Sequence, residues 1–141
     1  MGRARQMERI IAKGQLVPLV FVQSGVTSGQ SGVALGITGS AATAYTLPWE
    51  FEVVGAAVES SATVSAGAGS LAVLIDGNAA LTLSLDSTVN TDRDSAVAER
   101  GRYVGARGSA VSVEITTDAD FNISGGDIVV TVFVLAHLEG V

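Results

Sequence analysis

Apolar and polar residues alternate along much of this 141-residue chain, in short segments that Gly, Ser and Asp separate. In Ala110–Thr116, every second residue from Val111 to Ile115 is apolar and the residues between are polar. The three leucines of Ala80–Leu85 follow the same rule. A period of two is typical of a strand with one face in the core and the other in water. Both segments are therefore predicted strands.

Two further segments, Phe51–Glu59 and Ile128–His137, are apolar on both sides of the alternation. Strands that are covered on both faces show such continuous apolar runs. We therefore predict that both are central strands of a sheet. Leu16–Gln23 is a third strongly apolar strand, but Pro18 lacks the N–H that a central strand needs. This favours an edge position.

Turn signals connect these segments. Asp76-Gly77 lies between Leu71–Ile75 and Ala80–Leu85 and is typical of a tight hairpin turn. Weaker strands are expected at Val33–Ile37, Ala42–Leu47 and Arg102–Ala106, and surface loops at Ser24–Gly32, Ser65–Ser70 and Asp86–Glu99. Together the pattern predicts an all-β protein, an antiparallel β-sandwich or jelly roll of about eight strands. We assign residues 15–141 to this domain and residues 1–14 to an extended basic N-terminal arm.

The composition indicates an aliphatic core and gives no sign of a membrane helix or of disulfides. Hydrophobic residues make up 48% of the chain but aromatic residues only 5%, so small branched side chains must fill the core. No apolar run approaches the roughly 20 residues of a membrane helix, and no secretory signal follows the N-terminal arginines. We therefore expect no membrane partner and a protein made without secretion. The chain has no Cys, which removes disulfides and thiolate metal ligands.

Charge is divided unevenly between the arm and the body. Residues 1–14 carry four cations against one acid, a net charge of +3, whereas residues 15–141 carry four arginines against thirteen acids, a net charge of −9. A basic arm is expected to meet a negative surface, while an acidic body disfavours nucleic-acid binding. Met7, Ile10 and Ile11 have helical spacing, which indicates a segment that orders against a partner. The predicted partner-binding residues are Arg3, Arg5, Arg9, Ile10, Ile11 and Lys13. The alternative is a loose terminus without a role.

Groups for catalysis are scarce. The single histidine, His137, ends an apolar strand, and no nucleophile or acid is identified beside it. The pairs Asp92/Asp94 and Asp118/Asp120 have the look of calcium loops but lack the Gly and Glu of an EF-hand, and Asp is also a common turn former. We predict that the protein is not an enzyme and has no catalytic residues, no metal site and no cofactor.

Two stretches contain a characteristic series of segments. Tyr45–Leu85 has an apolar strand, a V-x-A-G turn and a strand ending in Asp-Gly, and Ala110–Val134 has the strand V-x-V-x-I-T-T-D. In this the chain resembles small β-sandwich proteins of the structural modules of tailed bacteriophages. The resemblance implies a capsid decoration (cement) or head-fibre protein, made in the host cytoplasm and bound to the major capsid protein on the capsid exterior of the virion. It also implies a homotrimer, and it carries over no active residues. The alternative is a carbohydrate- or receptor-binding module of a phage tail or fibre, which would need an exposed aromatic side chain near Trp49 or Tyr103.

Overall fold

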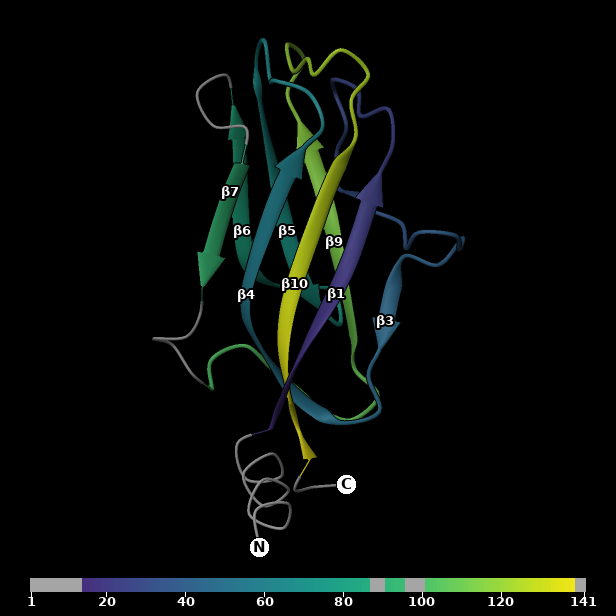
Figure 1. Cartoon of the computed structure of the whole chain (residues 1–141), viewed down its shortest axis with the longest axis vertical. Coiled ribbons are helices and arrows are strands. Elements are labelled where there is room, and N and C mark those ends of the chain that lie inside the picture. Colours follow the sequence, from purple (N-terminus) through teal and green to yellow (C-terminus); the bar gives the residue numbers. More distant parts are fainter. Residues whose placement is uncertain (1–13, 87–90, 96–100, 139–141) are drawn as a thin grey trace, which may run out of the picture.

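The computed structural model describes residues 14–86, 91–95 and 101–138, with residues 91–95 described by their backbone alone. It is a sandwich of two antiparallel sheets that face each other (Figure 1). This confirms the predicted fold class. Within the described residues, no helix is long and apolar enough to cross a bilayer.

The first sheet, which we call sheet A, has the order β1-β10-β4-β7, and β8 also pairs with β4. It faces the viewer in Figure 1. Its strands are β1 (Gln15–Gln23), β10 (Ile128–His137), β4 (Glu50–Ser60), β7 (Thr91–Ser95) and β8 (Val104–Gly105). The edge position of the Pro18 strand and the central positions of β4 and β10 are therefore confirmed.

The second sheet, sheet B, lies behind sheet A in Figure 1. Its order is β2-β9-β5-β6, and β3 also pairs with β9. Its strands are β2 (Val33–Ala34), β9 (Ala110–Thr117), β5 (Ala68–Ile75), β6 (Asn78–Asp86) and β3 (Ala44–Thr46). β5 and β6 form the hairpin predicted at Asp76-Gly77.

Two loop predictions need correction. β7 lies inside the predicted loop Asp86–Glu99, and it pairs with β4 from Thr91 to Ser95. An edge strand needs only backbone pairing on one side, so a polar sequence can form it without an apolar alternation. β5 begins at Ala68, inside the predicted loop Ser65–Ser70, because Gly69 and Ser70 pair with strands on both sides.

The core lies between the sheets and consists mostly of aliphatic side chains, as the composition predicts. The residues predicted to point inward from β6 and β9 are all buried, and on β10 the buried side holds Val130, Val132 and Val134. Sheet A also contributes Phe21 and Phe51, and the connecting segments contribute Val26, Leu35, Val64, Phe121 and Ile123. One contiguous core therefore holds both sheets together.

A register shift in β4 changes which residues face the core. Gly55 stands opposite Phe133 on β10, but the next pair joins Val53 to Val134, so Val54 is an extra residue. A strict alternation over Phe51–Glu59 would place Glu52 and Val58 on one face. With the bulge, Val53 and Val58 both face the core and Glu52 faces away from it.

The β5–β6 turn is tied to the start of β9. Asp76 and Gly77 both have positive φ, 50° and 81°, as a tight primed turn requires. The Asp76 carboxylate accepts a hydrogen bond from the Ala110 N–H at 2.9 Å, and the Asp76 N–H donates to the Ala110 carbonyl at 2.9 Å. The hydrogen bond from Ala110, followed by one from Ser109, lowers the pKa of Asp76 below its ordinary value of 3.8.

This linkage predicts an acid-dependent loss of stability. Because the pKa of Asp76 is lower in the folded state, its stabilisation is complete above the unfolded-state pKa and is lost as pH falls through the folded-state pKa. We expect the melting temperature of the wild type to fall more steeply below about pH 5 than that of Asp76→Asn, which cannot titrate and tolerates positive φ. Thermal unfolding followed by circular dichroism from pH 7 to pH 2 tests this. Parallel curves would contradict it.

Candidate docking surface

The outer surface of sheet A is apolar over its first two strands. Leu19 and Phe21 of β1 are buried in the core, so the alternate residues of that strand point outward. The register places each outward residue of β1 opposite one of β10: Leu16 with Leu135, Pro18 with Phe133, Val20 with Thr131 and Val22 with Val129. We call these eight residues the β1–β10 face. Leu16 is 55% exposed, and Val20 and Val129 are each 39% exposed.

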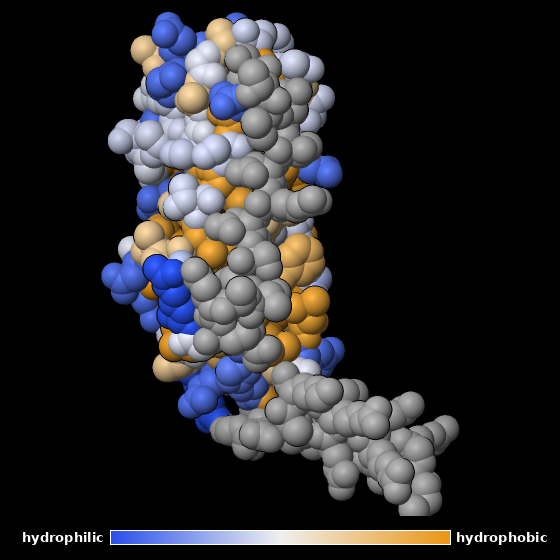
Figure 2. Space-filling model, turned by 90° about the vertical axis from the view of Figure 1, so that its left-hand side faces the viewer, coloured by the Kyte–Doolittle hydropathy of each residue, from blue (hydrophilic) through white to orange (hydrophobic). Residues whose placement is uncertain are grey.

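The outer surface of sheet B has a different character. Its outward positions on β5, β6 and β9 are mainly occupied by Ser70, Thr82, Ser84, Ser112, Glu114 and Thr116. In Figure 2 the molecule is turned so that the side facing the viewer in Figure 1 lies at the right. Hydrophobic residues reach that right-hand edge in the lower half of the body. The fold thus tolerates a polar outer surface on one sheet and carries an apolar one on the other.

The outer edge of β1 is occupied at Val22 and in part at Val20. The Val22 N–H donates to the Gly36 carbonyl at 2.8 Å, and the Gly36 N–H donates back to the Val22 carbonyl at 2.9 Å. The Tyr45 hydroxyl donates to the Val20 carbonyl at 3.2 Å, and Pro18 has no N–H to offer. Among the described residues of β1, Leu16 is the one with both edge-facing backbone groups available for an added strand.

The predicted partner-binding residues Arg3, Arg5, Arg9, Ile10, Ile11 and Lys13 lie outside the described residues. The structure does show where the arm joins the body. Gly14 has φ +81° and lies against the backbone of Ala136 near the end of β10, where a Cβ would overlap the carbonyl. β1 and β10 pair up to Gln15 and Ala136 at this pole. The arm is therefore attached at the Leu16 end of the β1–β10 face.

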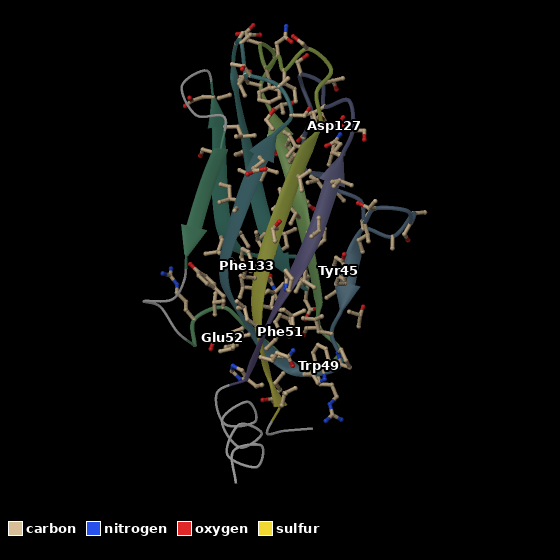
Figure 3. The ribbon with its side chains drawn as sticks, viewed as in Figure 1. Tyr45, Trp49, Phe51, Glu52, Asp127 and Phe133 are labelled. Atoms are coloured by element: carbon tan, nitrogen blue, oxygen red, sulfur yellow. The ribbon has the colours of Figure 1, made fainter. Side chains whose placement is uncertain are left out.

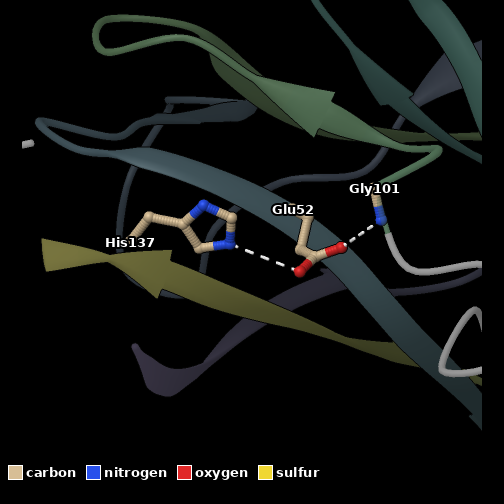
Figure 4. A network of polar contacts seen from close by, with 3 residues as sticks. All are labelled: Glu52, Gly101 and His137. Atoms are coloured by element: carbon tan, nitrogen blue, oxygen red, sulfur yellow. Dashed lines mark hydrogen bonds and ion pairs between the residues drawn. The ribbon is translucent and has the colours of Figure 1, made fainter. Parts of the chain in front are cut away.

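A buried carboxylate lies at the same pole of sheet A (Figures 3 and 4). Glu52 is 2% exposed, and its Oε2 accepts a hydrogen bond from the Gly101 N–H at 2.7 Å. Its Oε1 lies 3.3 Å from His137 Nε2. The sequence did not indicate this pairing, because the bulge at Val54 determines the direction of Glu52. The contacts connect β4, β10 and the segment before β8, so we assign Glu52 a structural role.

Asp118, one of the aspartates considered as calcium ligands, accepts backbone hydrogen bonds, and so does Asp127. The Asp118 carboxylate accepts backbone hydrogen bonds from Ala68 at 2.9 Å and from Asp120 at 3.0 Å. The Asp127 carboxylate accepts one from Gly25 at 3.1 Å. Within residues 14–86 and 101–138, no three His, Asp or Glu side chains are grouped so that they could hold a metal ion. Asp92 and Asp94 lie on β7, where only the backbone is described.

The aromatic side chains considered for sugar binding are packed rather than open. Trp49 and Tyr103 are both half-buried against the core. The Arg102 guanidinium lies over the Tyr103 ring, 5.1 Å from its centroid. The Tyr45 ring meets Phe21 edge to face, with centroids 5.3 Å apart. Because a sugar-binding platform needs an open aromatic face, we do not propose the carbohydrate-binding alternative.

Comparisons with known proteins assign no family. No protein-family model matches this chain, and no curated protein matches it. Among solved structures, one chain of a structure titled "Sacbrood virus of honeybee" aligns with a TM-score of 0.36 and 8% sequence identity. The alignment covers 89% of this chain and 70% of that chain. A likeness this distant carries no conclusion about function.

Proposed function

We propose that this protein is a structural component of a tailed-phage virion, a decoration protein that binds the major capsid protein on the outside of the head. The observation that carries the proposal is the separation of charge, a +3 arm attached to a −9 body. The arm joins the body at one pole of a rigid sandwich, where its cations can reach a negative surface without bringing the acidic body against it. The resemblance of Tyr45–Leu85 and Ala110–Val134 to phage β-sandwich proteins supports the same role.

The arm is the proposed attachment element. Arg3, Arg5, Arg9 and Lys13 supply the charge, and Ile10 and Ile11 supply apolar contacts on a short helical stripe. Each exposed ion pair contributes only about 0.2–1 kcal/mol. Tight attachment therefore comes from several contacts made together, and from the many identical sites that a capsid repeats.

A pair of full-length variants tests the arm. Replacing Arg3, Arg5, Arg9 and Lys13 by Gln changes the net charge from −6 to −10, and replacing the four body arginines Arg93, Arg100, Arg102 and Arg107 by Gln makes the same change. We expect the arm variant to bind at least about fourfold more weakly, from four lost ion pairs of about 0.2–1 kcal/mol each. The body variant should bind like the wild type. Co-sedimentation with heads assembled from the major capsid protein of the same genome measures the occupancy.

Equal occupancy of the two variants would contradict the role of the arm. Thermal unfolding of both variants shows whether each domain is still folded. If neither variant nor the wild type sediments with the heads, the decoration function itself fails.

A further inference from the structure

We propose that the Asp76-Gly77 turn is a modification site, at which aspartate converts to isoaspartate when the turn opens, and that the contact with β9 keeps it closed. The modification is spontaneous, and water is its only co-reactant. It is independent of the proposed attachment to a capsid, because it concerns the chemical stability of the β5–β6 hairpin.

The reaction joins the side chain of Asp76 to the backbone of the next residue. The Gly77 nitrogen attacks the carboxyl carbon of Asp76, a C–N bond forms, and the carboxyl hydroxyl leaves as water together with the amide proton. The product is a five-membered succinimide ring. Water then opens the ring at one of its carbonyl groups. Cleavage at the side-chain carbonyl restores aspartate, and cleavage at the main-chain carbonyl gives isoaspartate, whose backbone runs through Cβ and Cγ.

The sequence and the exposure of the turn both favour this position. No other Asp or Asn of the chain is followed by Gly. Gly77 has no side chain to shield its nitrogen, and nothing lies within 4 Å of its Cβ position. Asp76 is exposed, so water reaches the ring. Asp118 and Asp127, by contrast, are followed by Ala and Ile, whose side chains hinder the attack.

The backbone of the folded turn opposes ring closure. Asp76 and Gly77 both have positive φ, and Ile75 pairs with Asn78, which together define a two-residue type I′ turn. The first central residue of such a turn has a ψ of about +30°, which directs the next nitrogen away from Cβ. The succinimide ring is nearly planar and needs that nitrogen beside Cβ. Ring closure therefore requires the turn to open locally.

The start of β9 restrains the carboxyl group as well. The Ala110 N–H donates to the Asp76 carboxylate at 2.9 Å, and the Asp76 N–H donates to the Ala110 carbonyl at 2.9 Å. The hydrogen bond from Ala110, and after it the one from the Ser109 side chain, lowers the pKa of Asp76. A carboxylic acid loses water far more readily than a carboxylate, so the lower pKa leaves less of the reactive form at neutral pH.

Isomerisation would in turn loosen the hairpin. Isoaspartate adds one carbon atom to the backbone between Ile75 and Gly77, so the connection no longer fits a two-residue turn. Its free carboxylate is attached to Cα instead of Cβ and is displaced from the Ala110 N–H. The link between the β5–β6 turn and β9 is thus both the barrier to the reaction and the structure that the reaction removes.

Full-length proteins incubated at neutral pH, in buffer and in concentrated urea, test the proposal. Peptide mapping with electron-transfer fragmentation locates and counts isoaspartate over time. We expect the wild type to isomerise at Asp76 at least about tenfold more slowly in buffer than in urea, because only the small population with an open turn reacts. In urea, Gly77→Ala should lose most of the reaction, since its Cβ hinders the attacking nitrogen.

A matched pair of variants isolates the contact with β9. Ser109→Ala removes one hydrogen bond to the Asp76 carboxylate and should speed the reaction in buffer at least about twofold. Thr82→Ala removes a hydroxyl from the exposed side of the same hairpin and should react like the wild type. Circular dichroism checks that both variants are folded in buffer.

Three results would overturn the proposal. Isoaspartate that forms in urea no faster at Asp76 than at the other aspartates removes the site. Equal rates for the wild type in buffer and in urea remove the protection by the folded turn. Equal rates for Ser109→Ala and Thr82→Ala in buffer remove the role of β9. If Ser109→Ala does not fold, the wild type in buffer and in urea still decides whether the turn is the protected site.

Discussion

Phe51→Ala is expected to lower the free energy of unfolding by about 3–5 kcal/mol, the range for removing a buried aromatic side chain. Phe51 is 1% exposed and points from β4 into the core. Its ring also lies under β8, where a Cβ on Gly105 would overlap it. The smaller side chain leaves a cavity between β4 and β8 that the rest of this aliphatic core cannot fill without moving backbone.

Phe133→Ala is the matched control for Phe51→Ala. Phe133 lies on β10 in the same sheet, but on its outer face, where it is only half-buried (Figure 3). The same chemical change should cost clearly less stability here, because water can occupy the space that the ring leaves. Urea unfolding measures the free energy of unfolding of both variants. Equal losses would show that Phe133 is not on an outer surface of the single chain.

Gly67→Ala is expected to destabilise the fold by about 2 kcal/mol or more, of which the left-handed backbone accounts for about 1–2 kcal/mol. Gly67 has φ +72° just before β5. A Cβ at this position would overlap the backbone of Phe121 and Asp120 and the carboxylate of Asp118. These atoms belong to a hydrogen-bonded turn and cannot move independently, so the turn or the start of β5 must shift.

Gly77→Ala separates the two causes. Gly77 has φ +81°, close to that of Gly67, but nothing lies within 4 Å of its Cβ position. It should therefore show only the backbone cost, and the difference between the two variants measures the overlap with the turn at Phe121. Urea unfolding of both proteins tests this. A Gly77 variant that loses as much stability as the Gly67 variant would contradict the proposed overlap.

The strands that alternate strongly could be predicted from the sequence. β6 and β9 have one apolar and one polar face because one side meets the core and the other meets water, and Asp76-Gly77 has the turn chemistry of a hairpin. β7 could not be predicted, since pairing with β4 at an edge demands nothing of its side chains. The direction of Glu52 could not be predicted either, because a bulge depends on the register between two strands.

The β1–β10 face had a signal in the sequence that admits two interpretations. Val129 and Phe133 lie on the outer side of β10, away from its buried side. An apolar run on both sides of a strand can be explained by a central position in the sheet. In a two-layer sandwich, however, even a central strand has one face that no other layer of the same chain covers. The apolar residues on that outer side are therefore left uncovered by any other layer of the chain. The sequence alone does not show how many layers a fold has.

The contacts of Gly36 and Tyr45 with β1 also bear on solubility at high local density. A β-rich chain whose terminal strand offered a complete row of free N–H and C=O groups would template pairing with its neighbours and grow into fibres. Along β1 that row is interrupted by the Tyr45 hydroxyl, by the backbone of Gly36 and by Pro18, which has no N–H. Many copies can therefore be crowded together without polymerising through this strand.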